Sequence, residues 1–184
     1  MRRILYISLS LMFALTMQAQ KDVTTFKGVP VDGSRKAVVL KLKANGCKYG
    51  KDNGLATDFA DGRYNVKVLS GRKGVYQVKL TDMEGTENLD SIINRYNSLV
   101  DWFRSNPDYT EYEYNRYIYR GDDDTHVKYI NENWYYAEFF QKAKDEHEEL
   151  YSKPVSFYLT GEEGDYRIVI CFENRNNMPN NMRQ

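Results

Sequence analysis

The amino-acid sequence predicts an α+β fold, in which helices cover one face of an antiparallel sheet. Residues 55–80 contain three successive runs of alternating apolar and polar residues, the pattern of antiparallel strands with one buried face. Residues 86–104 show the three-then-four apolar spacing of an amphipathic helix. Residues 155–172 contain two more alternating runs, so strands are expected on both sides of this helix.

Residues 1–19 predict a signal peptide and are set aside from the fold. Two arginines precede an apolar run at residues 4–17, and Ala19 is a small residue at a plausible cleavage position. The run is too short to span a bilayer, and no cysteine lies near the cut, so a bacterial lipid anchor is excluded. We therefore expect a periplasmic or secreted protein with no membrane anchor after leader removal, and one α+β domain over residues 20–173.

The first half of this domain is expected to begin with one helix. Asp32 or Ser34 can serve as its N-cap after the Asp32-Gly33 turn, and Gly46 is expected to end it. Turn signals at Asp61-Gly62 and at residues 71–74 then separate the three alternating runs. The expected strands are residues 55–59, 64–69 and 75–80.

The second half begins with the long helix, for which Thr86 is the expected N-cap and Asn106-Pro107 the end. Residues 112–119 resemble a strand with a bulge at Asn115-Arg116. Residues 133–150 are ambiguous, and their aromatic beginning favours a strand to about Phe140, followed by a short charged helix or loop. The last expected elements are strands at residues 155–159 and 166–172 and a flexible tail at residues 174–184.

The order of helix and strands therefore repeats, which suggests two similar α-β-β-β halves in one sheet. The opening Phe26-Lys27-Gly28-Val29-Pro30-Val31-Asp32-Gly33, followed by a helix that stops at Asn45-Gly46, resembles an uncharacterised family of small exported bacterial proteins. The layout is similar to that family over most of the mature chain. The family in turn resembles the β-lactamase-inhibitor-protein-like fold, in which the open face of a helix-covered sheet meets a partner. The resemblance implies fold and export but no catalytic residue, and the charged stretch Lys142–Lys153 departs from the family.

Charge and cysteine content narrow the function classes further. The chain has 26 basic and 26 acidic residues. This balance argues against a nucleic-acid partner, which would require a concentrated basic face. Cys47 and Cys171 permit one disulfide in an oxidising compartment, although free buried thiols are the simpler expectation for a domain of this size.

Candidate catalytic and metal-binding groups do not form a recognisable set. His147-Glu148 lacks the second histidine of a zinc-protease motif, because Tyr151 stands at that position. Asp122–Asp124 with His126 lack the glycine and distal glutamate of a calcium loop. Neither cysteine lies in a nucleophile motif, and Glu111 with Glu113 has only the spacing of exposed strand residues. We expect no catalytic residue, metal or cofactor.

The polar face of the sheet is the strongest functional candidate. If Val66, Tyr76, Phe157 and Ile168 face the helices, tyrosines and basic residues gather on the opposite face, and such residues are typical of partner contacts. The residues expected there are Lys67, Leu69, Gln77, Lys79, Tyr135, Tyr158, Arg167, Val169 and Glu173.

The sequence therefore favours an exported, non-enzymatic binding module that contacts another protein or envelope component with Lys67, Tyr135, Tyr158 and Arg167. The simpler alternative is that this surface is the ordinary solvent-exposed face of an antiparallel sheet. A third hypothesis is a small-ligand binder, for example for glycans, or an enzyme that uses the aromatic cluster at residues 112–140. A purely structural role in the envelope is also consistent with the sequence.

Overall fold

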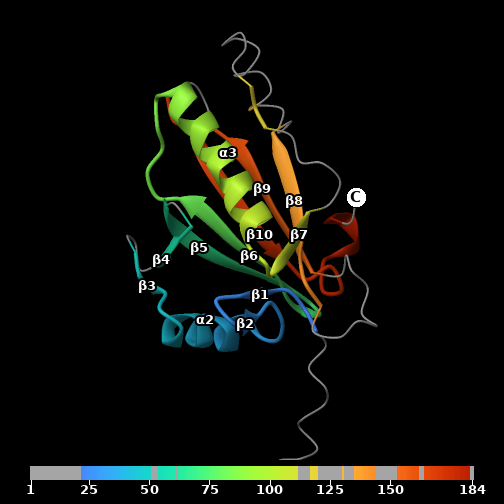
Figure 1. Cartoon of the computed structure of the whole chain (residues 1–184). Coiled ribbons are helices and arrows are strands. Elements are labelled where there is room, and N and C mark those ends of the chain that lie inside the picture. Colours follow the sequence, from blue (N-terminus) through green and yellow to red (C-terminus); the bar gives the residue numbers. More distant parts are fainter. Residues whose placement is uncertain are drawn as a thin grey trace, which may run out of the picture.

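The computed structural model describes residues 22–50, 54–60, 62–111, 117–119, 130, 135–143, 153–161 and 164–182. The predicted signal peptide and most of the aromatic cluster lie outside these residues. The described part contains an eight-stranded antiparallel sheet, a two-stranded sheet and two α-helices, which is an α+β fold dominated by its sheet (Figure 1). No helix in the described ranges is long and apolar enough to cross a membrane.

The elements follow the chain in two runs. The first is β1 (Thr25–Phe26), β2 (Val29–Pro30), α2 (Arg35–Ala44), β3 (Lys48–Tyr49), β4 (Leu55–Phe59), β5 (Gly62–Gly71) and β6 (Gly74–Asp82). The second is α3 (Leu89–Ser105), β7 (Tyr109–Glu111), β8 (Tyr136–Gln141), β9 (Pro154–Thr160), β10 (Arg167–Glu173) and the 3₁₀ turn η2 (Asn180–Met182).

The order of strands in the large sheet is β3-β4-β5-β6-β10-β9-β8-β7. Each helix is thus followed by a run of antiparallel neighbours, and the two runs meet where β6 pairs with β10. The predicted strands that the structure describes are confirmed within one or two residues, and β8 confirms the strand expected near Phe140 in the ambiguous stretch. The predicted strand at residues 112–119 falls mostly outside the described residues, and its last three carry no strand.

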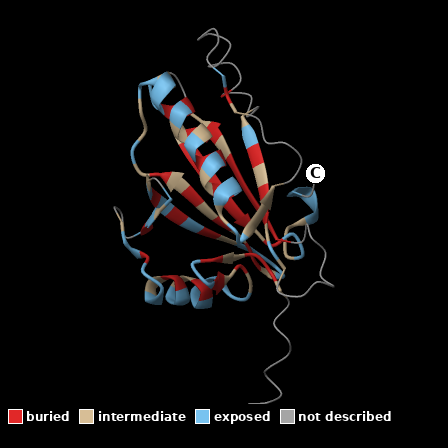
Figure 2. Ribbon diagram, viewed as in Figure 1, coloured by how far each residue is buried: buried red, intermediate tan, exposed pale blue. Residues whose placement is uncertain are grey.

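The two helices occupy different places on the sheet. Figure 1 shows α3 lying across one face over β9 and β10, whereas α2 lies at one end and contacts β2, β5 and β6. The buried stripe of α3 includes Ile92, Tyr96 and Phe103. Figure 2 shows buried and exposed positions alternating along β5, whereas β9 and β10 are buried at nearly every position. The face away from α3 therefore has no helix among the described elements.

The helix caps explain where the helices begin and end. Ser34 caps α2, its Oγ accepting a hydrogen bond from the Ala37 N–H at 3.3 Å. Gly46 follows the helix with a φ of 93°, and the Cys47 N–H donates to the Leu42 carbonyl, which closes a Schellman-type end. The expected Thr86 cap of α3 is wrong. Asn88 caps that helix by accepting from the Ser91 N–H at 2.8 Å.

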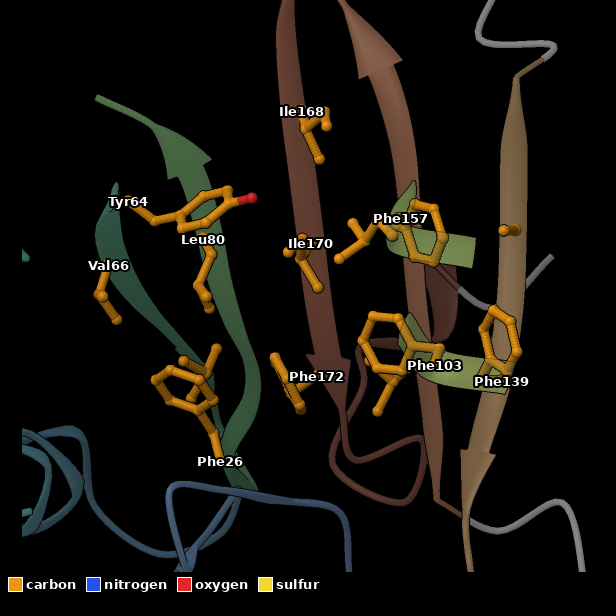
Figure 3. Packing of buried hydrophobic residues seen from close by; sticks show 14 of the residues in the cluster. Phe26, Tyr64, Val66, Leu80, Phe103, Phe139, Phe157, Ile168, Ile170 and Phe172 are labelled. Carbon is orange, nitrogen blue, oxygen red and sulfur yellow. The ribbon is translucent and has the colours of Figure 1, made fainter. Parts of the chain in front are cut away.

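Aromatic packing holds α3 to the sheet. The ring of Phe103, which is fully buried, stacks on Phe157 at 5.4 Å and on Phe139 at 5.1 Å between ring centroids (Figure 3). The rings of Phe103 and Tyr109 form an edge-to-face pair, with centroids 4.8 Å apart and an interplanar angle of 88°. Offset stacked and edge-to-face pairs are the favoured aromatic geometries, so Phe103 is the centre of the helix–sheet contact.

A buried carboxylate makes a second link between α3 and the sheet. Asp82, at the end of β6, is 2% exposed and accepts two hydrogen bonds from the Arg95 guanidinium, each 3.0 Å long. It also accepts from the Ile168 N–H of β10 at 2.7 Å. One side chain thus ties together α3, β6 and β10.

Residues 174–182, the described part of the predicted flexible tail, form hydrogen bonds with the rest of the fold. Asn174 is 2% exposed and its side-chain amide donates to the Val31 carbonyl at 2.9 Å. Asn177 donates to the Asp32 carboxylate at 2.7 Å and to the Val75 carbonyl at 3.0 Å. These bonds attach the C-terminal segment to the β5–β6 hairpin and to the turn before α2.

Candidate functional site: the open face of the sheet

The candidate site is the sheet face opposite α3, called here the open face. The strand register defines its rows, because residues that pair across neighbouring strands lie on the same face. One row contains Lys67, Lys79, Cys171, Ser156 and Glu138. The next row contains Asn65, Thr81, Val169, Tyr158 and Tyr136.

Two lysines stand directly opposite each other in the middle of the open face. Lys67 of β5 and Lys79 of β6 are Cα partners in the antiparallel ladder. Within the described part of the chain, no carboxylate oxygen lies within ion-pair distance of either ammonium. Like charges directly opposite each other in a sheet are destabilising, so this pair reduces the stability of the isolated fold.

Tyr158 lies beside the lysine pair. The Lys79 ammonium is 5.9 Å from the centroid of the Tyr158 ring, within the range of a cation–π contact. Because β10 lies between β6 and β9, this contact spans β10, whose Val169 and Cys171 are only 2% and 4% exposed. An almost wholly buried apolar centre thus lies between Lys79 and Tyr158 on this face.

Two carboxylates of the open face, Glu138 and Glu173, are already engaged. Glu138 pairs with the Arg175 guanidinium, and Glu173 accepts from the Gln77 amide at 2.7 Å. Burial raises the pKa of Glu173, an effect that Gln77 and Arg175 oppose. Burial also raises the pKa of Tyr136 to about 12, with a further contribution from Glu138. Among the described residues, these two carboxylates thus have partners, whereas the two lysines have no ion-pair partner.

The four predicted contact residues do not all lie together. Lys67 and Tyr158 are on the open face, as expected. Tyr135 is not, because it precedes β8 in phase with Ala137 and packs against the hydrophobic core. Tyr136 takes the place on the open face, paired with Tyr158. Arg167 lies at the end of the face, but its guanidinium donates to the Asp165 carboxylate and to the Asp82 carbonyl.

The lysine pair gives a stability prediction. Lys67→Glu should raise the free energy of unfolding by about 0.2 to 1 kcal/mol, because a repulsive cross-strand pair becomes an attractive one. Urea denaturation of the two proteins measures the difference. Lys67→Gln, which removes repulsion without adding attraction, should fall between them, and a destabilised Lys67→Glu protein would contradict the arrangement.

The structure describes some of the residues that were considered as nucleophiles, catalytic carboxylates or metal ligands. Cys47 and Cys171 are both buried and are not joined by a disulfide. Burial raises the pKa of the Cys171 thiol to about 12, so this thiol stays protonated near neutral pH. Glu111 forms two hydrogen bonds with the Arg104 guanidinium, at 2.6 and 2.9 Å. Asp122–Asp124, His126 and His147 lie outside the described residues, within which no three potential ligands gather around a metal position.

The aromatic cluster at residues 112–140 falls largely outside the described residues. Of its described members, Phe139 is fully buried in the core. Tyr117 lies against α3, where its hydroxyl donates to Asp101 and accepts from Arg104. Phe139 thus serves the core, and Tyr117 is engaged by two side chains of α3.

Comparisons with known proteins add no relative. No protein-family model, no curated protein and no solved structure matches the chain.

Proposed function

We propose that the protein is an exported, non-enzymatic binding module that uses the open face of its sheet to contact an acidic surface of another protein in the envelope. In this proposal Lys67, Lys79, Tyr136 and Tyr158 are the contact residues. Tyr136 replaces Tyr135, and Arg167 is a supporting residue at the end of the face. The proposal includes two similar halves in an arrangement like the β-lactamase-inhibitor-protein-like fold.

The observation that carries the proposal is the uncompensated lysine pair. A fold under no functional demand would gain stability from a carboxylate at either position, as Arg104 gains from Glu111 elsewhere on the surface. Lysines facing each other beside a tyrosine ring instead provide two positive charges and an amphipathic surface, which complement a carboxylate-bearing partner. Electrostatic complementarity of this kind determines partner choice and association rate.

The test is retention of envelope protein on immobilised mature chain. Reversing both charges, with Lys67→Glu and Lys79→Glu together, should abolish retention of the partner, and raising the salt concentration should weaken it for the wild-type chain. The matched control carries Lys36→Glu and Lys41→Glu, two reversals at exposed positions of α2. Equal recovery by all three proteins would contradict the proposed surface.

A further inference from the structure

A pocket lies on the other side of the sheet, near the end of α3. It is a pocket of about 460 Å³, called here the α3-end pocket, within the size range of small-molecule sites. Its walls come from the segment around β1, the Asp108-Tyr109 corner after α3, and the ends of β8 and β10. The open face and this pocket share none of the proposed contact residues, so the two sites are independent.

Long-range bonds fix the walls of the α3-end pocket. The Gln141 side chain pairs with the backbone of Thr25 through two hydrogen bonds of 2.7 Å, as a neighbouring strand would. Lys153, only 3% exposed, forms an ion pair with Asp22 and donates to the Lys142 carbonyl at 3.0 Å. Because these bonds already hold the pocket walls in place, a ligand loses little binding free energy to ordering them, which favours affinity.

Aromatic rings form the apolar part of the pocket. Phe59 and Tyr109 are half-buried and line it above Phe26 and Phe172, which are almost wholly buried. The Phe26 and Phe172 rings lie 4.8 Å apart, and Phe59 meets each of them within 5.7 Å. Phe59 and Tyr109 thus offer a fixed apolar surface to a ligand.

Charged side chains form the rim. Lys27, at the tip of the β1–β2 turn, and Lys142 are exposed, and neither ammonium has an ion-pair partner among the described residues. Asp108 is also exposed, and its carbonyl accepts from the Lys142 N–H at 2.9 Å, so the two residues adjoin along the rim. The rim therefore offers two free cationic donors and one carboxylate acceptor.

We infer that the α3-end pocket binds a short saccharide that carries a carboxylate. A wholly apolar ligand would bury three charged groups without partners, which is costly. A small inorganic anion would leave the aromatic surface unused. A sugar acid uses the aromatic surface and the charged rim together. Its C–H face packs on Phe59 and Tyr109. Its carboxylate meets Lys27 and Lys142, and its hydroxyls donate to Asp108.

Calorimetric titration of the mature chain, residues 20–184, tests the inference with three probes. Digalacturonic acid should bind, and the neutral galactobiose of the same linkage should bind about tenfold more weakly, because it lacks the charge-assisted hydrogen bonds. Benzoate, an acid with no hydroxyls, should bind more weakly than digalacturonic acid. Absence of digalacturonic acid binding to the folded wild-type chain would overturn the inference, as would equal affinity for galactobiose.

Two variants assign the binding to this pocket. Lys142→Gln and Phe59→Leu should each weaken digalacturonic acid binding by about tenfold, through the lost charge and the lost ring respectively. Lys142 is exposed, so its variant keeps the fold even if Phe59→Leu perturbs packing. Lys79→Gln, a matched change on the open face, should leave the affinity unchanged. Binding that is insensitive to both pocket variants would overturn the assignment, independently of partner binding by the open face.

Discussion

Replacing Phe103 with alanine should lower the free energy of unfolding by about 3 to 5 kcal/mol, the range for deleting a large buried ring. The side chain is fully buried and stacks on Phe139 and Phe157, so α3 loses the centre of its contact with β8 and β9. Surrounding rings from Phe59 and Tyr109 cannot all move into the cavity, because each is fixed by other neighbours. Chemical denaturation with an unchanged m-value measures the loss.

Phe103→Leu is the control for this prediction. It keeps most of the volume and removes only the stacking geometry, so it should cost clearly less than the alanine change. A Phe103→Ala protein that unfolds at the same denaturant concentration as the wild type would show that α3 is not held to the sheet at this point.

Asp82→Ala should lower the free energy of unfolding by about 2 to 4 kcal/mol, because it removes three hydrogen bonds of a buried carboxylate, two of them from a guanidinium. The change leaves the Arg95 guanidinium, 29% exposed at its side chain, without its two hydrogen bonds to this carboxylate. It also leaves the Ile168 N–H unpaired within the sheet. The partial exposure of Arg95 places the expected loss below that of a wholly buried pair.

The control compares this pair with an exposed one of the same chemistry. Asp165 pairs with Arg167 at 3.0 Å, but its side chain is 57% exposed, so Asp165→Asn should cost less than about 1 kcal/mol. Thermal or urea unfolding of both variants measures the contrast. Equal losses from the two changes would contradict the role given to Asp82.

Most of the strands could be predicted because their signal is local. Alternation along β5 and β6 directly records which side chains face the core. β9 and β10 are buried on both faces, and their short apolar runs between turns predict the strands within one or two residues. The face of β8 was predicted wrongly around Tyr135. Both Phe139 and Phe140 are buried, so alternation is hidden there, and a shift of one residue moves every side chain to the other face.

The start of α3 and the course of the C-terminal segment depend on contacts between distant residues. Thr86 pairs with Tyr166 through two backbone hydrogen bonds of 3.0 and 2.9 Å, which keeps it out of the helix that its sequence position favoured. Asn174 and Asn177 bond to residues far away in the chain, although asparagine-rich composition is typical of loose ends. Composition alone does not distinguish a loose C-terminal segment from one that long-range hydrogen bonds attach to the fold.

The candidate sites were predictable to different degrees. Lys67 and Tyr158 were placed on the open face from alternation alone, whereas the cross-strand pairing of Lys67 with Lys79 required the register. The α3-end pocket left no sequence signal that could have been recognised. Its walls are brought together by Gln141 reaching the backbone of Thr25, a contact across 116 positions of the chain.

The central proposal, that the open face meets a protein partner, is tested most directly by site-specific photo-crosslinking in intact cells. A photo-reactive phenylalanine analogue replaces Tyr158 on the open face or, as a control, Leu40, which is 57% exposed on α2. The predicted result is one discrete protein adduct from position 158, lost when Lys67 and Lys79 are both changed to glutamate, and none from position 40. The same adducts from both positions, or no adduct from position 158, would contradict the claim.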